Sequence, residues 1–415
     1  MSFLRNKIYS LLRFTEKYTK TDMVYLTKGG FWLSLGQVFN ALGGFLTLYI
    51  FSTFAPQHVF GTYQYVLSIV SVLYVFALPG IATALTRAFA KGVDGVLIRA
   101  IRMKLLWGIS ASILSLLLAL YYFINSNDLL AGSFLIVSFF LPTMGAFQLY
   151  RSVLNGRKMF RRVAQFDIIS RIFSVCLMGI VLFLTNNLVI IIFSYFLFHT
   201  LLRGSFLFYT LRALSFNKIN DTETFSYAKH LSFMGILAVV AAQFDKILVF
   251  HYLGAVELAV YIIALTPVDQ LRSIVGIIRT IAFPKLSAQS AAVIKKTLLK
   301  KILRLELLII PVIALYITCI PFLIRHIFPQ YIDAIIYSQV LIFYLLFSPR
   351  SLITTALKAQ MKTKELYIIR ILGPLFRMII LFPLLKFFGL WGAVWGLLIS
   401  ELFLYILYYL VFRRI

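Results

Sequence analysis

The sequence predicts an all-α integral membrane protein of about twelve transmembrane helices, arranged as two six-helix halves. Composition is the first observation behind this prediction: 61% of the 415 residues are hydrophobic, 13% are charged, and the mean hydropathy is +0.93. Soluble domains are usually about 45–50% apolar, so the excess indicates that lipid surrounds most of the chain. The other two observations are an alternating distribution of basic residues and an internal repeat.

A transmembrane helix requires about 20 mostly apolar residues, and twelve segments meet this requirement. The first six are residues 31–52, 60–84, 105–124, 130–150, 164–184 and 188–211. The second six are residues 228–250, 258–283, 303–323, 332–352, 366–387 and 391–411. The sequence therefore predicts an amphipathic cytoplasmic segment at 1–30, six-helix lobes at 31–211 and 228–411, a cytoplasmic linker at 212–227 and a cytoplasmic tail at 412–415.

Basic residues distinguish the two sides of the membrane. Cytoplasmic loops carry an excess of Lys and Arg, and the segments on the side of the N-terminus hold most of the 40 basic residues. Lys104, Arg203 and Arg350 belong to this group, whereas the opposite loops hold only Arg325 and Lys386. The bias predicts that both termini are cytoplasmic. It also explains the net charge of +26 without a nucleic-acid partner.

Two hairpin sequences in the two halves of the chain resemble each other. Residues 54–63 read FAPQHVFGTY and join the first two helices, and residues 252–261 read YLGAVELAVY and join the seventh and eighth. Two halves that both begin inside form a parallel repeat, as in transporters that rock about a central site. Chance similarity between two hydrophobic hairpins is the alternative interpretation.

Charged residues at membrane depth gather in the second half of the chain. The eighth helix carries Asp269, Arg272 and Arg279, and the two arginines lie two turns apart on one face. Arg377 of the eleventh helix and Glu401 of the twelfth lie at a similar depth. A charge in the bilayer costs about 2.5–3.5 kcal/mol on insertion scales, so such residues face a cavity or a partner. They either line a polar transport cavity or form a neutralised network in which Asp269 and Glu401 are counter-ions of Arg272 and Arg377.

Four further polar residues each have two interpretations. Asp245 and Lys246 lie near the outer end of the seventh helix, where Lys246 either faces the cavity or extends to the outer interface. Gln37 and Asn40 lie among glycines of the first helix and either line the cavity or bond across packed helices. The residues expected to act in ion coupling or as counter-ions are Asp269, Glu401 and Asp245.

The sequence gives no indication of a cofactor or a metal. The five histidines lack metal-ligand spacing, and Cys176 and Cys319 lie in apolar runs, where we expect them to be small core residues. The sequence contains no phosphate-binding loop motif, so nothing in it indicates an ATP-driven pump. The predicted external loops are short, which argues against an enzyme that acts at the outer surface.

Several motifs resemble those of one known family. Residues 243–254 (QFDKILVFHYLG), followed by 258–261 (LAVY), resemble the hairpin between helices seven and eight of polysaccharide, or O-antigen, flippases. These belong to the multidrug/oligosaccharidyl-lipid/polysaccharide exporter (MOP) superfamily, and residues 60–63 (FGTY) and 392–401 (GAVWGLLISE) fit the same pattern. The resemblance extends over nearly the whole chain and implies a MATE-like fold. Two departures are Ala259 in place of the glycine found at Gly61, and twelve helices where lipid II flippases generally have fourteen.

The resemblance implies a transporter, not an enzyme, that flips an undecaprenyl-pyrophosphate-linked oligosaccharide across the bacterial inner membrane by alternating access. The cargo would be an O-antigen, capsule or related repeat unit, and arginine binds its phosphate oxygens bidentately. Expected partners are membrane lipids, a proton or sodium gradient and polysaccharide polymerase machinery. The alternatives are a multidrug or cation antiporter of the same superfamily and a membrane polysaccharide polymerase or ligase. The residues expected to line the lumen are Arg272, Arg377, Arg279, Lys246, Gln37 and Asn40.

Overall fold

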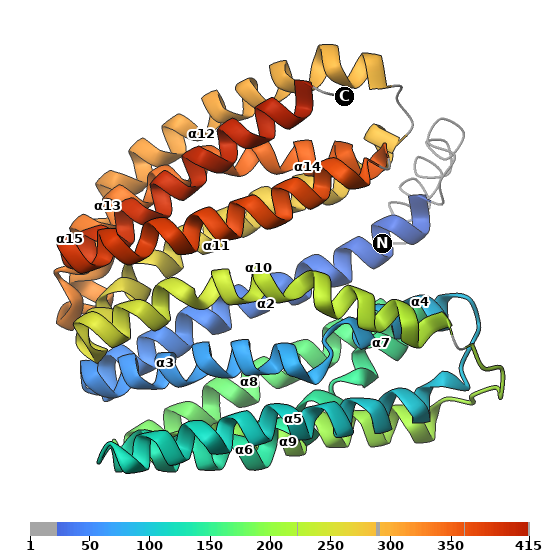
Figure 1. The fold of residues 1–415 in the computed structure, drawn as a ribbon, viewed down its shortest axis with the longest axis horizontal. Coiled ribbons are helices and arrows are strands. Elements are labelled where there is room, and N and C mark those ends of the chain that lie inside the picture. Colours follow the sequence, from blue (N-terminus) through green and yellow to red (C-terminus); the bar gives the residue numbers. More distant parts are fainter. Residues whose placement is uncertain (1–22, 222, 288–290, 361, 414–415) are drawn as a thin grey trace, which may run out of the picture. The chain divides into compact units, whose positions relative to one another are not determined.

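The computed structural model describes residues 23–221, 223–287, 291–360 and 362–413, and within these ranges all regular structure is helical (Figure 1). The first nine elements are α2 (Met23–Phe54), α3 (Gln57–Leu73), η1 (Tyr74–Ala77), α4 (Gly80–Ala90), α5 (Val96–Ile124), α6 (Asp128–Phe147), α7 (Leu149–Gly156), α8 (Phe160–Leu184) and α9 (Leu188–Ala213), where η denotes a 3-10 helix. The others are α10 (Glu223–Leu253), α11 (Ala255–Ser287), α12 (Ala291–Ile327), η2 (Pro329–Tyr331), α13 (Ala334–Leu341), η3 (Ile342–Arg350), α14 (Ser351–Ala359) and α15 (Thr363–Arg413).

Each of the twelve predicted transmembrane segments is helical over most of its length. Among the described residues, ten helical stretches are long and apolar enough to cross a membrane. α11 is a further long helix, and α15 comprises two helices because Gly389 breaks it with φ 56° and ψ −137°. The predicted helical fold class is therefore confirmed. Residues 1–22 of the predicted amphipathic segment and 414–415 of the predicted tail lie outside the described residues.

The two parts of α15 form a tight helical hairpin. A Cβ atom at Gly392 would overlap the carbonyl oxygen of Leu384, and one at Gly396 would crowd Leu381. The rings of Phe376 and Phe403 stack with their centroids 3.9 Å apart. Small residues let helix backbones approach closely within a membrane. The glycines of this segment therefore serve helix packing.

Two of the predicted spans are interrupted inside their length. The second span consists of α3 with η1, a break, and then α4. At the break Leu78 has φ 48°, and α4 begins directly after Pro79. Lys104 of α5 is buried and donates a 3.2 Å hydrogen bond from Nζ to the carbonyl oxygen of Leu78. The tenth span contains η3, a 3-10 helix of nine residues between α13 and α14. Runs of 3-10 helix longer than about four residues are uncommon and often mark functional positions.

The chain divides into two compact units. Unit 1 contains the residues up to Thr47, Phe76–Leu184 and Val189–Phe233. Unit 2 contains Leu48–Val75, Thr185–Leu188 and the residues from Met234 onward. The division of the sequence into lobes at 31–211 and 228–411 stays a prediction.

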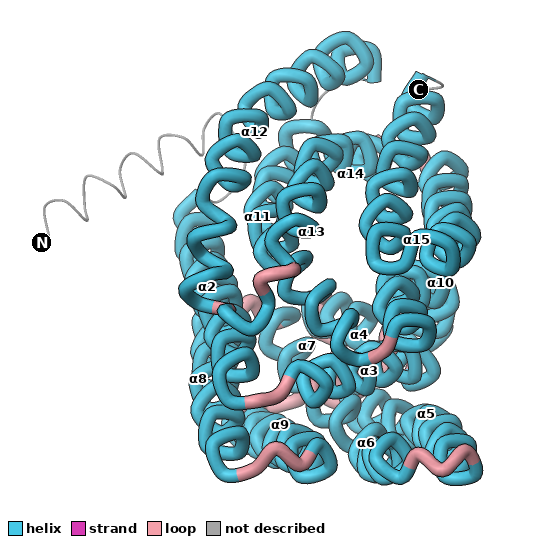
Figure 2. The backbone as a smooth tube through the Cα atoms, turned by 90° about the vertical axis from the view of Figure 1, so that its left-hand side faces the viewer, coloured by secondary structure: helices cyan, strands magenta, loops and turns pink. Residues whose placement is uncertain are grey.

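In unit 1, α5 and α6 form a closely packed antiparallel pair, as Figures 1 and 2 both show. A Cβ atom at Gly108 of α5 would lie 2.5 Å from the Cα atom of Pro142 in α6. A hydrogen bond also connects the two helices: the Ser115 hydroxyl of α5 donates to the carbonyl oxygen of Phe134 in α6 at 2.8 Å. The core of unit 1 lies nearby, where α4, α7 and the beginnings of α5 and α10 bury their apolar side chains together.

In unit 2, the two repeated hairpin sequences pack against each other through α3 and α11. A Cβ atom at Gly61 would overlap the carbonyl oxygen of Ala255, so only glycine permits this approach. The rings of Tyr65 and Phe250 stack with centroids 3.8 Å apart and an interplanar angle of 10°. The two sequences related by the repeat are therefore direct neighbours.

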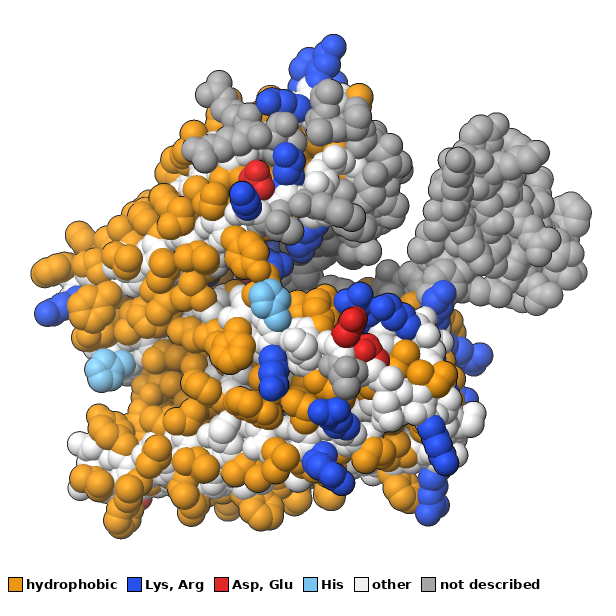
Figure 3. Space-filling view, turned by 45° about the vertical axis from the view of Figure 1, so that its right-hand side comes forward, with side chains coloured by type: hydrophobic (Ala, Val, Ile, Leu, Met, Phe, Trp, Pro, Cys, Tyr) orange, Lys and Arg blue, Asp and Glu red, His pale blue; other side chains and the backbone are white. Residues whose placement is uncertain are grey.

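Many large apolar side chains are exposed among the described residues. Hydrophobic groups cover most of the face in Figure 3, whereas Lys and Arg gather mainly toward its right-hand side. Exposed apolar patches of this extent mark a lipid-facing surface. Cys176 and Cys319 are exposed on it, so the expectation that they are core residues is wrong. Their apolar sequence context could not distinguish the protein core from the lipid.

Candidate substrate-binding site

Asp245 of α10 is the centre of the first charged cluster in unit 2. Its side chain is 1% exposed, and Oδ2 accepts hydrogen bonds from the Tyr261 hydroxyl at 2.8 Å and from Arg377 Nη2 at 2.9 Å. Among the described residues, Oδ1 of Asp245 and Nε of Arg377 are buried without a hydrogen-bond partner. An unpaired buried polar atom is costly, so these two atoms are available to another group.

Arg272 of α11 forms a second, more accessible cluster with η3. Its Nη1 contacts Asp269 Oδ1 at 3.2 Å, and its Nε donates a 3.4 Å hydrogen bond to the Ser348 hydroxyl. Its guanidinium carbon lies 3.3 Å from the centroid of the Tyr344 ring, a cation–π contact. The side chains of Arg272 and Asp269 are 28% and 49% exposed. This pair therefore faces an accessible space, whereas Asp245 does not.

Arg350 and Glu401 form a third, buried ion pair between η3 and α15. Arg350 ends η3 and bonds to the Glu401 carboxylate. It also donates a 2.6 Å hydrogen bond from Nη1 to the carbonyl oxygen of Glu401. Their side chains are 8% and 6% exposed, and the aromatic rings of Phe347 and Tyr408 lie beside the guanidinium.

The three clusters interact electrostatically within unit 2. Lys246 and Asp245 lie near Asp269, and Arg272 lies near Arg350. The Tyr344 hydroxyl lies near both Arg350 and Arg377. We name this set the unit 2 charge network; its charged members are Asp245, Lys246, Asp269, Arg272, Arg350, Arg377 and Glu401. It holds one more basic group than acidic groups.

The structure corrects two expectations about this network. In the interpretation as a neutralised network, Glu401 was a counter-ion of the arginines Arg272 and Arg377, but it pairs with Arg350, and Arg377 pairs with Asp245. Arg350 was counted among the bases of the cytoplasmic loops, yet it ends η3 and is buried. The expected pair of Asp269 and Arg272 is present. The side chain of Arg279 lies outside the described part of the chain.

The two candidate residues of the first helix lie in unit 1. Gln37 is exposed, whereas Asn40 is half-buried and its Oδ1 accepts a 3.3 Å hydrogen bond from Arg171 Nε. The Arg171 side chain packs against α2 at Gly43, where a Cβ atom would overlap it. Asn40 thus bonds across two packed helices. Arg203 lies near His199 and Tyr195 of the same helix rather than in a loop.

The comparisons with solved structures show the fold. An outward-facing multidrug resistance MATE family transporter of the MOP superfamily has 13% identity and a TM-score of 0.65, with 94% of each chain covered. A MATE protein in complex with MaD5 has 13% identity and a TM-score of 0.63, covering 94% of this chain and 95% of that one. A MOP superfamily transporter from Pyrococcus furiosus, whose binding pocket is described as having reverse polarity, has 14% identity and a TM-score of 0.60 over 94% and 95% of the chains. No curated protein sequence matches the chain.

The fold is the multi-pass helical fold of these transporters. The family described as "Polysaccharide biosynthesis protein" matches residues 26–290. The chain belongs to this family. The resemblance found in the sequence motifs is therefore confirmed.

Proposed function

We propose that the protein flips an undecaprenyl-pyrophosphate-linked oligosaccharide, such as an O-antigen or capsule repeat unit, from the cytoplasmic to the outer face of a bacterial inner membrane. Membership of the polysaccharide biosynthesis family and the fold of MOP transporters support this function. Alternating access would expose the pyrophosphate site to each side in turn, while the prenyl chain stays in lipid. The proposal includes cytoplasmic termini, a proton or sodium gradient as the driving force, and association with polysaccharide polymerase machinery.

The observation that carries the proposal is the accessible Arg272–Asp269 pair, which lies beside two buried ion pairs of the network. Its partner Asp269 is half-exposed, and exposed ion pairs contribute only about 0–1 kcal/mol, so a ligand can replace that partner at little cost. The Tyr344 ring holds the guanidinium plane in place, and a planar guanidinium binds two phosphate oxygens at once. A pyrophosphate would therefore bind at Arg272, with the excess basic charge of the network stabilising it.

The buried members of the network have a different proposed role. Arg350–Glu401 and Arg377–Asp245 hold η3, α10 and α15 together, because each pair lies largely out of contact with solvent. Among the buried nitrogen donors of these pairs, Nε of Arg377 has no hydrogen-bond partner within the described residues. Arg377 would add one hydrogen bond to the substrate without releasing Asp245. Lys246 adds positive charge near Asp269.

A multidrug or cation antiporter is the second candidate function, because the similar structures include MATE multidrug transporters. A cationic drug requires a pocket with excess negative charge or exposed aromatic rings. The unit 2 charge network has the opposite excess, and the Tyr344 ring is already occupied by Arg272. The charge balance therefore favours an anionic substrate.

The test is binding of undecaprenyl pyrophosphate to the purified full chain in detergent. We expect Arg272→Gln to weaken binding by about tenfold or more, since a charge-assisted bidentate contact is lost. Lys300→Gln, a change of an exposed base on α12 outside the network, is the matched control and should bind normally. Equal binding by wild type and Arg272→Gln, or ethidium binding in place of the pyrophosphate, would overturn the proposal.

A further inference from the structure

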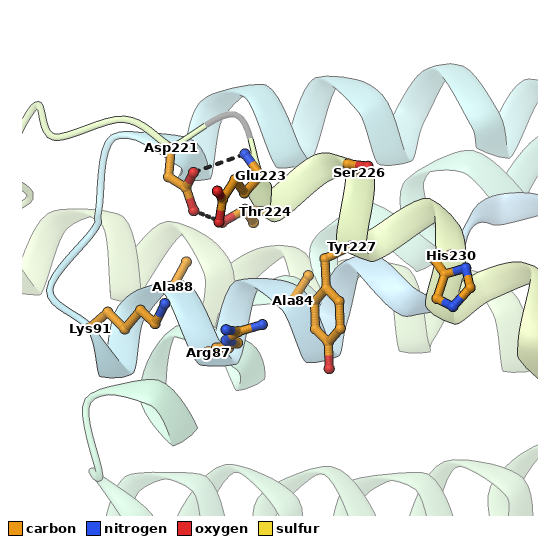
Figure 4. Close-up of a pocket in the computed structure, with 10 residues that line it drawn as sticks. All are labelled: Ala84, Arg87, Ala88, Lys91, Asp221, Glu223, Thr224, Ser226, Tyr227 and His230. Carbon is orange, nitrogen blue, oxygen red and sulfur yellow. Dashed lines mark hydrogen bonds between the residues drawn. The ribbon is translucent and has the colours of Figure 1, made fainter. Parts of the chain in front are cut away.

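Unit 1 contains a cavity of about 370 Å³ that is separate from the unit 2 charge network (Figure 4). It lies between α4 and the first two turns of α10. Two alanines of α4 form part of its wall, so the space is not filled by side chains there. The lining residues are Ala84, Arg87, Ala88, Lys91, Asp221, Glu223, Thr224, Ser226, Tyr227 and His230.

The basic groups of the cavity come from α4. Arg87 and Lys91 project from one face of that helix, one turn apart, as Figure 4 shows. The guanidinium carbon of Arg87 lies 5.0 Å from the centroid of the Tyr227 ring. Within the described residues, no carboxylate lies within 4.0 Å of the charged nitrogens of Arg87. Arg87 is therefore a positive group held in position by an aromatic ring and lacking a counter-ion.

The acidic groups lie on the opposite wall, and one of them is already occupied. Asp221 Oδ1 accepts a 2.8 Å hydrogen bond from the Glu223 amide, and Oδ2 accepts one of 2.9 Å from the Thr224 hydroxyl. These bonds, with the charge of Lys91 nearby, lower the pKa of the Asp221 carboxyl. The beginning of α10 is thus already capped and is not itself the binding group. The Glu223 carboxylate is exposed and, like Arg87, has no ion-pair partner in the described part of the chain.

The cavity lies where a lipid headgroup would be found. α10 is long and apolar enough to span a membrane, and its first residues line the cavity, so the cavity lies at one end of that span. Ser226, His230 and Phe233 share one face of α10 by helical spacing, and Phe233 is 64% exposed. This face leads from the polar cavity toward the apolar part of the span. An acyl chain could follow it while the headgroup stays in the cavity.

We propose that this cavity binds the headgroup of a zwitterionic aminophospholipid, with its phosphate on Arg87 and its primary ammonium on Glu223. Two basic groups, Arg87 and Lys91, and the exposed Glu223 carboxylate line the same cavity, so a ligand that carries a phosphate and an ammonium finds a group of opposite charge for each. An anionic lipid would meet the uncompensated Glu223 carboxylate. A quaternary ammonium cannot donate a hydrogen bond to Glu223, and the Tyr227 ring that would attract it is already covered by Arg87.

The experiment measures thermal stabilisation of the full chain in detergent by short-chain phosphatidylethanolamine, phosphatidylcholine and phosphatidylglycerol, with inorganic phosphate as a separate arm. A ligand that binds only the folded state raises the midpoint of unfolding. We expect phosphatidylethanolamine to stabilise the wild type most. Arg87→Gln should weaken the effect of every phospholipid, by about tenfold in apparent affinity.

Glu223→Gln provides the sharper test, because it removes only the group assigned to the ammonium. The variant should lose its preference for phosphatidylethanolamine and gain affinity for phosphatidylglycerol. Lys229→Gln, an exposed change on α10 outside the cavity, should keep the wild-type order. Equal responses of the wild type to all three lipids, an unchanged order in Glu223→Gln, or a response to inorganic phosphate as strong as that to the lipid would overturn the proposal.

Discussion

Arg377 Nη2 and Asp245 Oδ2 lie 2.9 Å apart although 132 positions separate them in the sequence. This bond joins α15 to α10 in the interior of unit 2, and the Tyr261 hydroxyl of α11 bonds to the same oxygen. Three helices therefore meet at one carboxylate. The neighbouring Arg350–Glu401 pair joins η3 to α15 in the same way. The accessible Arg272 lies next to a framework that these two buried pairs hold together.

The Asp245–Arg377 bond predicts strong destabilisation when only one partner is removed. Asp245→Leu leaves the Arg377 guanidinium buried without a counter-ion, which costs about 3–5 kcal/mol. Replacing both, as Asp245→Leu with Arg377→Met, should restore much of the loss because no charge stays buried. Thermal unfolding of the purified variants in detergent measures both effects. A double variant as unstable as the sum of the two single variants would contradict the pairing.

Because Arg272 is accessible and Arg350 is buried, replacing each by Gln should impair a different property: export for Arg272 and folding for Arg350. Arg272→Gln should fold normally and lose polymer export, because its ion pair with Asp269 is half-exposed. Arg350→Gln should reduce the amount of folded protein, because Glu401 would stay buried and uncompensated. Arg272→Lys should restore part of the export, as a point charge without the planar fork.

Polymer export in cells and the monomer peak in size-exclusion chromatography separate the two results. Normal export by Arg272→Gln combined with Arg377→Gln would show that these arginines do not bind the substrate. Loss of folded protein in Arg272→Gln would instead assign Arg272 a packing role.

The sequence predicted the helices of this protein better than it predicted the charge pairs. The length of the apolar segments and the break at Gly389 are local properties, so all twelve segments could be located. The burial of Arg350 depends on η3 packing against α15, and its position after Pro349 resembles the end of a span. The bond between Asp245 and Arg377 likewise depends on tertiary structure that no spacing rule contains.

The contact of Gly61 with Ala255 predicts a large effect from one methyl group. Gly61→Ala should lower stability by about 1–3 kcal/mol, the usual cost of overpacking, because its Cβ would overlap the Ala255 carbonyl oxygen. Gly235→Ala in α10 is the matched control, since a Cβ atom there meets nothing within 4 Å. Alanine also favours a helix over glycine by about 0.5–1 kcal/mol, so the control should be slightly more stable. Unfolding midpoints of the two variants check the contrast, and a harmless Gly61→Ala would exclude this packing.

The distribution of basic residues predicts the orientation of the chain in the membrane. In a background without Cys176 and Cys319, a membrane-impermeant thiol reagent should label Asn186→Cys, in the short connection between α8 and α9, in intact cells. Lys218→Cys, in the connection between α9 and α10, should react only after the cells are opened. Both positions are exposed, so access to the reagent differs only by the side of the membrane. The opposite pattern would place the termini outside.

Asp269 and Glu401 were both expected to couple transport to an ion or to act as counter-ions, and the structure separates them. Glu401 is buried against Arg350, so neutralising it should mainly reduce stability. Asp269 is half-exposed and interacts with Arg272 and Lys246, so its charge can respond when a substrate binds Arg272. A proton or a sodium ion could occupy the carboxylate once its arginine turns to the pyrophosphate. Asp269→Asn should therefore keep substrate exchange between liposome faces but lose accumulation driven by an ion gradient.

Counter-flow in liposomes measures exchange without a net gradient, and an imposed proton or sodium gradient then measures coupling with the same preparation. Glu401→Gln is the comparison variant. The part of this variant that folds should accumulate substrate with the same dependence on the gradient as the wild type. If Asp269→Asn accumulates substrate as the wild type does, Asp269 is only the counter-ion of Arg272. If both exchange and accumulation stop while the variant stays folded, Asp269 is needed to position Arg272 rather than to carry the ion.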